Sequence, residues 1–351
     1  MHAMSARSTL ILTAEKVKQI LEHDLTGLSS TCIVQLVISE DKTRIHGLCM
    51  SLGNRSVKFK EVISAPYSPD AKQRFLDEVS MRDWLGNSAA ESLFTPEGDL
   101  FSYDDTRFAH PWLRKIWTAI VHATKPQAGA ERWHICLIRD PELANLPWQW
   151  IAMNNSADDD WPLVSLSHGL RWYYSAMFPE LVGDFATKSH YRGVRIWLAA
   201  QPTPAPNNDY REMVENNFTT ADNNFSLAVL FGHGSSRDSD ALRDPTAWEK
   251  VQRYRVSFLL SCQTGRAVSA GLGDANSLVN FLSTTAQAVL APAMNVHYKF
   301  ALALSSKFSE LKPYCLKGER VPVHRLYLDA INENPGVALF SLWGLPFEPL
   351  T

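Results

Sequence analysis

The sequence predicts an α/β protein in which parallel strands alternate with crossover helices, and three observations lead to this prediction. Short apolar runs typical of buried strands recur from about residue 133 onward. Segments with helical spacing lie between these runs. The pattern of an antiparallel hairpin is found earlier in the chain, ahead of that alternation. Together these features favour a mainly parallel sheet preceded by a hairpin.

The first 130 residues are predicted to form helices around one β-hairpin. Residues 14–25 place apolar side chains at helical spacing. Residues 31–50 give two β-rich runs around a polar turn, which is the pattern of an antiparallel hairpin. Two further helices are predicted over residues 68–86 and 111–124. We expect this region, residues 1–130, to brace the domain that follows it.

Residues 131–351 are predicted to form the α/β domain itself. The strands predicted here are 133–138, 194–199, 225–231, 256–260, 286–290 and 337–344. The helices predicted here are 244–255, 274–285 and 298–311. The Pro-rich stretch that begins at Gln201 is interpreted as a loop of the sheet, because another strand follows soon. A domain boundary at this stretch is the alternative.

Composition and charge exclude several classes of protein. The chain of 351 residues is 45% hydrophobic and 20% charged, an ordinary globular mixture. A net charge of -3 lacks the basic character of nucleic-acid-binding proteins, so no nucleic acid partner is expected. No signal-peptide core or apolar run of membrane length is found, so we expect a cytoplasmic protein that does not associate with membranes. The 5 cysteines form no CxxC pair, so no disulfide framework, metal site or cofactor is expected.

Two apolar runs each end at one reactive side chain. The run "LAVLF" continues into Gly232, His233 and Gly234, and the run "VSFLL" continues into Ser261 and Cys262. One crossover helix separates the two runs, so the two strands are expected to be neighbours in the sheet. Neighbouring strands lie about 5 Å apart, which lets an imidazole and a thiol meet over a shared groove.

This pair of side chains suits nucleophilic catalysis. An imidazole can accept the proton of a thiol and return a proton to the leaving group. The backbone N–H groups of Gly234 and Cys262 are expected to stabilise a developing oxyanion. A structural turn at His233 and a core role for Cys262 remain the alternatives.

At these residues the chain resembles the CHAT branch of the caspase-like cysteine peptidases. "LFGHG" is similar to the family's strand that ends in a His-Gly pair, and "LLSCQTG" to its strand that ends in a Ser-Ala-Cys-x-Thr-Gly turn. "RDPELANLPWQWI", "AQAVLAPAMNVHYKF" and "NPGVALFSLWG" resemble further family segments in the same order. The resemblance covers about residues 136–344. It implies a three-layer α/β caspase-like sandwich with a mainly parallel central sheet, preceded by the β-hairpin and helices.

The resemblance also implies what the two reactive residues do. It implies a cysteine endopeptidase in which Cys262 is the nucleophile and His233 is the general base and acid. The oxyanion hole would be formed by the backbone of Gly234 and Cys262, and no third catalytic residue is required.

Four residues are expected to contact the substrate: Leu260, Ser261, Met294 and Asn295. The resemblance implies that Leu260, two residues before the nucleophile, lines the pocket for the residue before the scissile bond. An apolar side chain there favours a small or apolar substrate residue, since a buried cation would need a paired charge. An extended peptide is expected to bind by adding itself as a strand. Met294 as a core residue is the alternative. The alanine of the family's turn is absent before Cys262, which leaves open the direction in which the preceding side chains face.

The resemblance therefore implies a peptidase of a prokaryotic defence or cell-death system. Its expected partners are a protein or peptide substrate and, where control comes from another chain, a regulatory protein subunit. Two alternatives stay open. The first is an inactive caspase-like scaffold or adaptor that binds a protein partner through the same groove. The second is a thiol acyltransferase with the same Cys-His chemistry.

Overall fold

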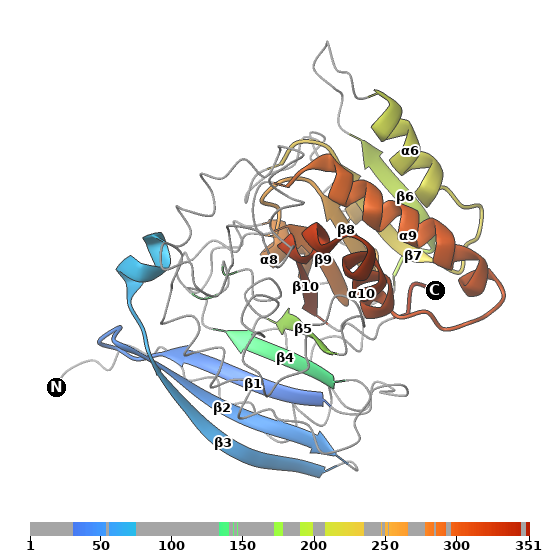
Figure 1. The fold of residues 1–351 in the computed structure, drawn as a ribbon. Helices are drawn as coiled ribbons and strands as arrows, with labels where there is room; N and C mark the ends of the chain where they lie inside the picture. The colour runs from blue at the N-terminus through green and yellow to red at the C-terminus, as the bar shows by residue number, and fades with distance from the viewer. Residues whose placement is uncertain are drawn as a thin grey trace.

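The structure is a computed structural model in which the described strands join into one sheet (Figure 1). It describes residues 31–53, 56–74, 133–139, 143, 146, 172–177, 190–198, 208–234, 247, 250–251, 253–265, 278–283, 286–292, 296–344 and 349–351. The predicted helices 14–25 and 111–124 lie outside these residues, as does most of the helix predicted at 68–86.

The order of elements alternates strands with helices over the second half of the chain. The described strands are β1 (Thr31–Ile38), β2 (Arg44–Gly53), β3 (Ser56–Pro66), β4 (Trp133–Arg139), β5 (Trp172–Met177), β6 (Gly193–Leu198), β7 (Ser226–Phe231), β8 (Val256–Leu260), β9 (Ala288–Pro292) and β10 (Phe340–Gly344). The helices with described bounds are α6 (Asn208–Phe218), α8 (Leu278–Ser283), α9 (Tyr298–Leu316) and α10 (Val323–Glu333), with the 3-10 helix η5 (Pro335–Leu339).

The described strands follow the order β3-β2-β1-β4-β5-β10-β9-β8-β7-β6 across the sheet. Strands β6 to β9 run parallel to one another. Strands β1, β4 and β5 are also parallel, and β10 pairs parallel with β5 and antiparallel with β9. The prediction of a mainly parallel sheet is therefore confirmed.

The predicted N-terminal hairpin is present as β1 and β2, which pair antiparallel. At its turn Asp41 accepts hydrogen bonds from the Ser39 hydroxyl and from the backbone and side chain of Thr43. These bonds, with Ser39 contributing most, lower the pKa of Asp41 to about 2. A third strand, β3, extends the hairpin, and β1 pairs with β4. The hairpin thus belongs to the same sheet as the strands that follow it.

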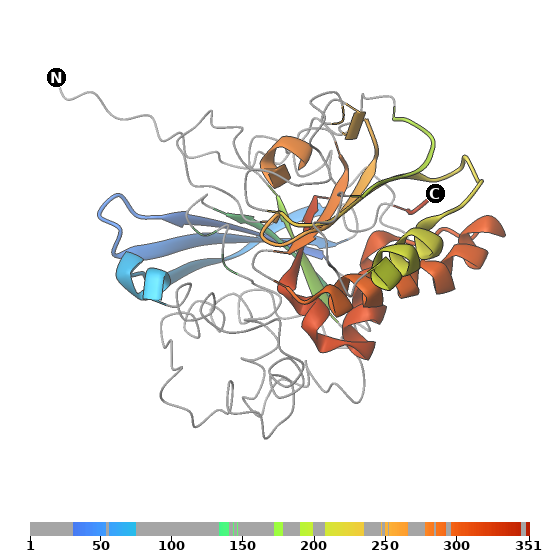
Figure 2. The ribbon, with the colours of Figure 1, turned by 90° about the horizontal axis from the view of Figure 1, so that it is seen from above.

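Described helices lie on both faces of the sheet around β7, β8 and β9, which gives three layers there (Figure 2). Successive residues of a strand point to opposite faces. Phe258 and Leu260 accordingly pack in the cluster under α6, α9 and α10, while Leu259 between them packs with Leu282 of α8 on the other face. The strands β7, β8 and β9 are apolar on both faces because both faces are covered.

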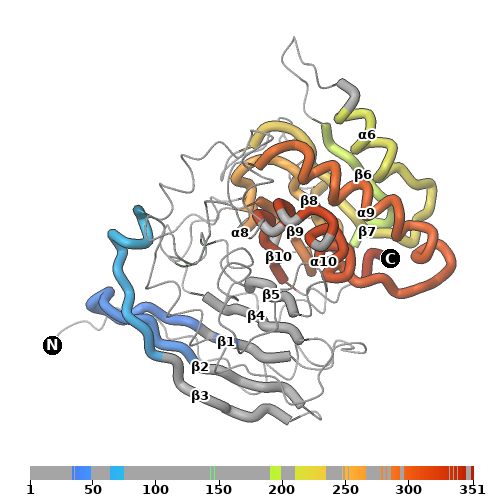
Figure 3. Tube along the Cα trace, in the orientation of Figure 1, coloured from blue at the N-terminus to red at the C-terminus, as the bar shows by residue number. Residues whose placement is uncertain are grey.

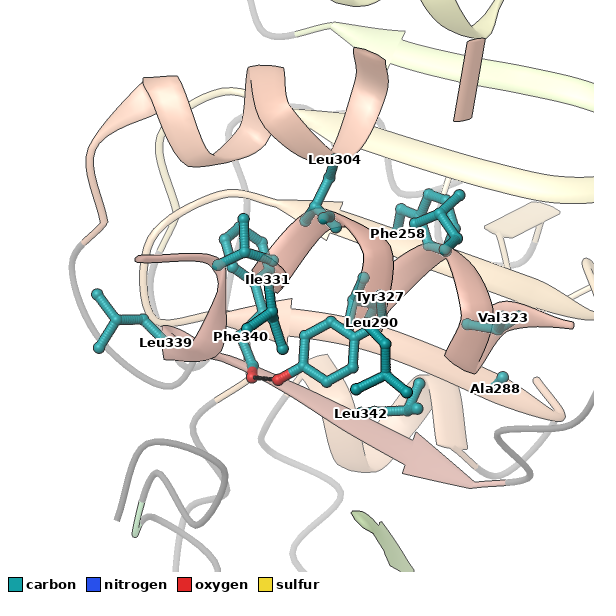
Figure 4. Packing of buried hydrophobic residues seen from close by; sticks show 14 of the residues in the cluster. Phe258, Ala288, Leu290, Leu304, Val323, Tyr327, Ile331, Leu339, Phe340 and Leu342 are labelled. Carbon is teal, nitrogen blue, oxygen red and sulfur yellow. Dashed lines mark hydrogen bonds between the residues drawn. The ribbon is translucent and has the colours of Figure 1, made fainter. Parts of the chain in front are cut away.

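The main core lies between the sheet and the helices α6, α9 and α10. Helices α6 and α9 run side by side (Figure 3). Phe218 of α6 contacts Phe258 of β8 and Phe308 of α9, with ring centroids 5.7 Å and 4.9 Å away. Beneath α10, the hydroxyl of buried Tyr327 donates a hydrogen bond to the carbonyl of Phe340 (Figure 4). This core fixes the strands whose ends carry the candidate site.

Most predicted strands of the α/β domain are observed within two residues of their expected bounds. One differs more at its start, because residues 335–339 form a 3-10 helix and the closing strand begins at Phe340. The first turn of that helix is closed by the N–H of Val337 donating to the carbonyl of Asn334. Strands β3 and β5 and helices α6 and α10 were not predicted. Among the described residues, no helix is both long and apolar enough to cross a membrane.

Candidate active site

The ends of β7 and β8 bring the two predicted catalytic residues to one edge of the sheet. The two strands are parallel neighbours, as predicted, and their last pair is Phe231 with Leu260. His233 and Cys262 each follow two residues after that pair. Both residues therefore follow the carboxyl ends of neighbouring strands, at the same edge of the sheet.

Gly234 packs directly against the turn that carries Cys262. A Cβ atom added to Gly234 would lie 2.7 Å from the Cβ of Ser261, 2.8 Å from Cγ2 of Thr264 and 3.0 Å from the carbonyl oxygen of Cys262. Any side chain at this position would force one of the two turns to move. Glycine therefore allows the turn after β7 and the turn after β8 to touch.

The turn that carries Cys262, residues 261–265, is called the cysteine turn here, and hydrogen bonds hold it in one conformation. The hydroxyl of Thr264 donates to the carbonyl of Ser261 over 2.7 Å, and the N–H of Gly265 donates to the carbonyl of Pro292 over 2.8 Å. Gln263 has a φ of 57°, in the left-handed region. Such a conformation costs a non-glycine residue about 1 kcal/mol or more and is concentrated at functional sites. The turn is thus a constrained support for the thiol.

The thiol of Cys262 contacts the backbone of Val296, at the start of α9. The N–H of Val296 donates to Sγ over 3.5 Å, and the thiol donates to the carbonyl of Val296 over 3.6 Å. Burial raises the pKa of Cys262, and the hydrogen bond with Val296 offsets part of that rise. In this conformation the thiol keeps its proton at neutral pH.

His233 and Cys262 differ in their exposure. The His233 side chain is exposed, and none of the described residues makes a hydrogen bond with its imidazole. Cys262 is partly buried and packs against the same core cluster as Leu260. The cysteine therefore lies on the α6–α9 face of the sheet.

The predicted substrate-binding residues have different positions. Leu260 is 3% exposed and Ser261 is 1% exposed, so both side chains are buried in this conformation. Met294 and Asn295 lie outside the described residues.

Sequence reasoning missed the residues at the start of α9. His297 is the buried N-cap of this helix, and its Nδ1 accepts a hydrogen bond from the N–H of Lys299. Its ring lies 4.1 Å from the ring of Tyr298, whose hydroxyl hydrogen-bonds to that of Tyr210 over 2.8 Å. A side-chain acceptor directly before a predicted helix was the signal for the cap. No sequence signal indicated that Val296 would contact the thiol.

The chain was compared with known proteins, and its structure is similar to solved structures. No protein-family model matches the chain, and no curated protein matches its sequence. The structure is similar to that of the Arg-specific cysteine proteinase gingipain R, with 10% identity, a TM-score of 0.44, and coverage of 70% of this chain and 69% of that one. It is also similar to a chain of the Saccharomyces cerevisiae separase–securin complex, with 11% identity, a TM-score of 0.48, and coverage of 95% of this chain and 31% of that one. Both similarities concern the arrangement of strands and helices.

Proposed function

We propose that the chain is a cysteine endopeptidase that uses His233 and Cys262 as a catalytic dyad. The observation that carries the proposal is the register of β7 and β8, which sets both residues two positions beyond one strand pair. The close packing of Gly234 on the cysteine turn supports it, because it ties the two strand ends together. A thiol and an imidazole placed in this way suit nucleophilic attack on a peptide carbonyl.

In the proposed mechanism, the imidazole of His233 accepts the proton of Cys262 and the thiolate attacks the carbonyl carbon of the scissile bond. The N–H groups of Gly234 and Cys262 donate to the resulting oxyanion. The imidazolium then protonates the leaving amine, the C–N bond breaks, and a thioester remains on Cys262. Water, deprotonated by His233, attacks the thioester, and the departing sulfur takes back the proton.

The free chain starts this sequence from a protonated thiol. The thiol of Cys262 donates a hydrogen bond to the carbonyl of Val296, and burial raises the pKa of the thiol. The thiol must leave this contact before His233 can accept its proton. We expect substrate binding beside Val296 to release the thiol. Without substrate, the contact with Val296 would keep the basal activity low.

The same contact favours a second candidate function. In a catalytically inactive scaffold or adaptor, a neutral Cys262 tied to Val296 would be a packing residue. The groove at the sheet edge would then bind a protein partner without cutting it. Cleavage assays separate the two functions, because only the peptidase depends on the chemistry of the thiol.

The test is cleavage of a peptide library by the full chain. Wild-type protein is compared with Cys262→Ala, Cys262→Ser, His233→Ala and the matched control Cys315→Ala. We expect Cys262→Ala and His233→Ala each to lower cleavage by about 100-fold or more, and Cys315→Ala to leave it unchanged. Cleavage that survives Cys262→Ala would overturn the assignment of the nucleophile. A wild-type chain that cuts no peptide and forms no adduct with a peptide chloromethyl ketone would overturn the peptidase.

Several finer proposals follow from the family resemblance. The library should show a small or apolar residue before the scissile bond, with Leu260, Ser261, Met294 and Asn295 contributing to the pocket. We also propose a cytoplasmic protein of a prokaryotic defence or cell-death system, with a protein substrate and a regulatory protein subunit. Residues 1–130 are proposed to brace a peptidase domain at 131–351, which the pairing of β1 with β4 supports.

A further inference from the structure

A cavity of about 440 Å³ opens at the edge of the sheet opposite the cysteine turn. It lies where β6, β7 and β8 begin, whereas Cys262 follows the end of β8. Residues before each of these strands line it, and the end of α9 closes another side. Its volume is in the range of pockets that hold small organic ligands, about 300–1,000 Å³.

The charged side chains among the described lining residues are Arg192 and Arg255, and His190 also contributes to the wall. None of these lining side chains is Asp or Glu, and the terminal carboxylate of Thr351 is the negative group at this wall. Arg192 is exposed and makes no ion pair with any described residue. Arg255 is partly buried, and its Nη2 donates to the carbonyl of Pro349 over 2.9 Å, which orients the guanidinium. Two guanidinium groups at one cavity suit an anion, because each can donate two parallel hydrogen bonds to a phosphate or carboxylate.

An aromatic ring forms another part of the wall. Tyr191 is 41% exposed, whereas the ring of Phe225 packs in the core against Phe308. The guanidinium of Arg253 lies 5.2 Å from the ring centroid of Tyr191 and donates to its hydroxyl over 2.9 Å. This adds a third arginine beside the cavity. The wall therefore combines positive charge with flat apolar surface.

The segments around the cavity are fixed to one another before any ligand arrives. The hydroxyl of Ser226 donates to the carbonyl of Tyr191 over 2.6 Å and accepts from the N–H of Arg255 over 3.0 Å. One buried serine thus joins the segments that lead into β6, β7 and β8. At Gly318 an added Cβ would meet nothing within 4 Å, so this side of the cavity is open. A site that is already ordered loses less conformational entropy when a ligand binds.

We propose that this cavity binds a nucleoside phosphate, with the phosphate on Arg192 and Arg255 and the base against the exposed ring of Tyr191. The cavity has room for more than an inorganic ion, and its aromatic wall gives an organic group apolar surface to cover. The proposal is independent of the peptidase, because it uses the opposite edge of the sheet.

Calorimetric titration of the full chain with AMP, GMP, CMP and UMP tests the proposal. We expect at least one nucleotide to bind saturably with a Kd below about 1 mM. Inorganic phosphate and the matching nucleoside should each bind about 10-fold more weakly or worse, because each offers only half of the contacts. Failure of all four nucleotides to bind would overturn the proposal.

Variants locate the site. Arg192→Glu replaces an exposed cation by an anion and should weaken binding by about 10-fold or more. Arg74→Glu makes the same charge change at another exposed position and should leave the Kd unchanged. Arg255→Lys keeps the charge but loses the paired donors, so binding should weaken several-fold in a chain whose unliganded melting temperature is retained. Equal losses in Arg74→Glu and Arg192→Glu would contradict a specific site.

A last variant separates this proposal from the peptidase. Cys262→Ala should bind the nucleotide as tightly as the wild type, because the thiol lies beyond the other end of β8. Loss of nucleotide binding in Cys262→Ala would contradict the placement of the ligand. Loss of cleavage with retained nucleotide binding would support the placement of the ligand at the opposite edge of the sheet.

Discussion

Cys262 and Cys315 are both free thiols, yet the structure places them in very different surroundings. Cys262 is partly buried, follows the end of β8 and lies on a constrained turn at the sheet edge. Cys315 is 5% exposed in the last turn of α9 and packs in the main core. Burial raises the pKa of both thiols, to about 11 for Cys315. Burial alone therefore does not distinguish a candidate nucleophile from a core cysteine.

The difference lies in what surrounds each sulfur. Sγ of Cys262 accepts a hydrogen bond from the N–H of Val296, and the neighbouring strand ends at His233. At Cys315 the Coulomb attraction of Arg325 only partly offsets burial, and Glu319 raises the pKa further. A parallel sheet gathers the ends of several strands at one edge, which is where cooperating side chains can meet. The position of Cys262 at such an edge is what makes it the better candidate.

The largest difference that we expect is in alkylation rate. In the folded chain at pH 8, iodoacetamide should modify Cys262 at least about 100-fold faster than Cys315, because the buried thiol reacts only after local unfolding. Peptide mass mapping over time measures both rates in one sample. In urea the two rates should become similar. Equal rates in the folded chain would show that the sheet edge gives Cys262 no special access.

Two glycines give a sharper test of the cysteine turn. Gly234→Ala should lower the free energy of unfolding by about 1–3 kcal/mol, because the added Cβ would lie 2.7 Å from the Cβ of Ser261. It should also change the alkylation rate of Cys262, since the turn must move. Urea unfolding and mass mapping measure the two effects.

Gly318→Ala is the matched control for this substitution, at a glycine close to Cys315. Its φ of 88° makes alanine strained there, but an added Cβ meets nothing within 4 Å. It should cost about 1 kcal/mol through the backbone and leave the alkylation of Cys262 unchanged. An equal change in both variants would mean that the packing of Gly234 has no local role.

The sequence was enough to predict the strands near the site and to predict that β7 and β8 are adjacent in the sheet. Buried parallel strands are apolar on both faces, so β7 and β8 appear as continuous apolar runs that stop abruptly at His233 and Cys262. Two parallel strands in sequence need a crossover connection, and one helix between them supplies it. Strands joined in this way are usually neighbours in the sheet. The antiparallel hairpin was also predictable, because a polar turn separates its two runs.

Other features depend on contacts between distant segments and could not be predicted. Helix α6 follows a Pro-rich stretch and carries few apolar residues, and it is anchored by Val214 and Phe218 packing on the core. Strand β3 was missed for a different reason, because its alternation of Val57, Lys58, Phe59 and Lys60 is a strand pattern that could have indicated it. Its position is fixed by pairing with β2. The contact of Val296 with Cys262 joins residues on separate strand ends. Such contacts are set by tertiary packing, which no local pattern encodes.

The smallest effect that we expect is a pH dependence of stability that belongs to Cys315. Because folding raises its pKa from 9.0 to about 11, the folded state favours the protonated thiol. The resulting stabilisation is complete below about pH 9 and is lost as the pH rises toward 11. Cys315 is also one of the residues that line the cavity between α9 and the start of β7, so solvent screens its charge in part. With this allowance the stabilisation amounts to about 1–2 kcal/mol. Urea unfolding of wild type and Cys315→Ala from pH 7 to pH 11 should show a smaller alkaline loss in the variant. Parallel curves would mean that Cys315 titrates alike in the folded and unfolded chains, which would contradict the burial of its thiol in the folded chain.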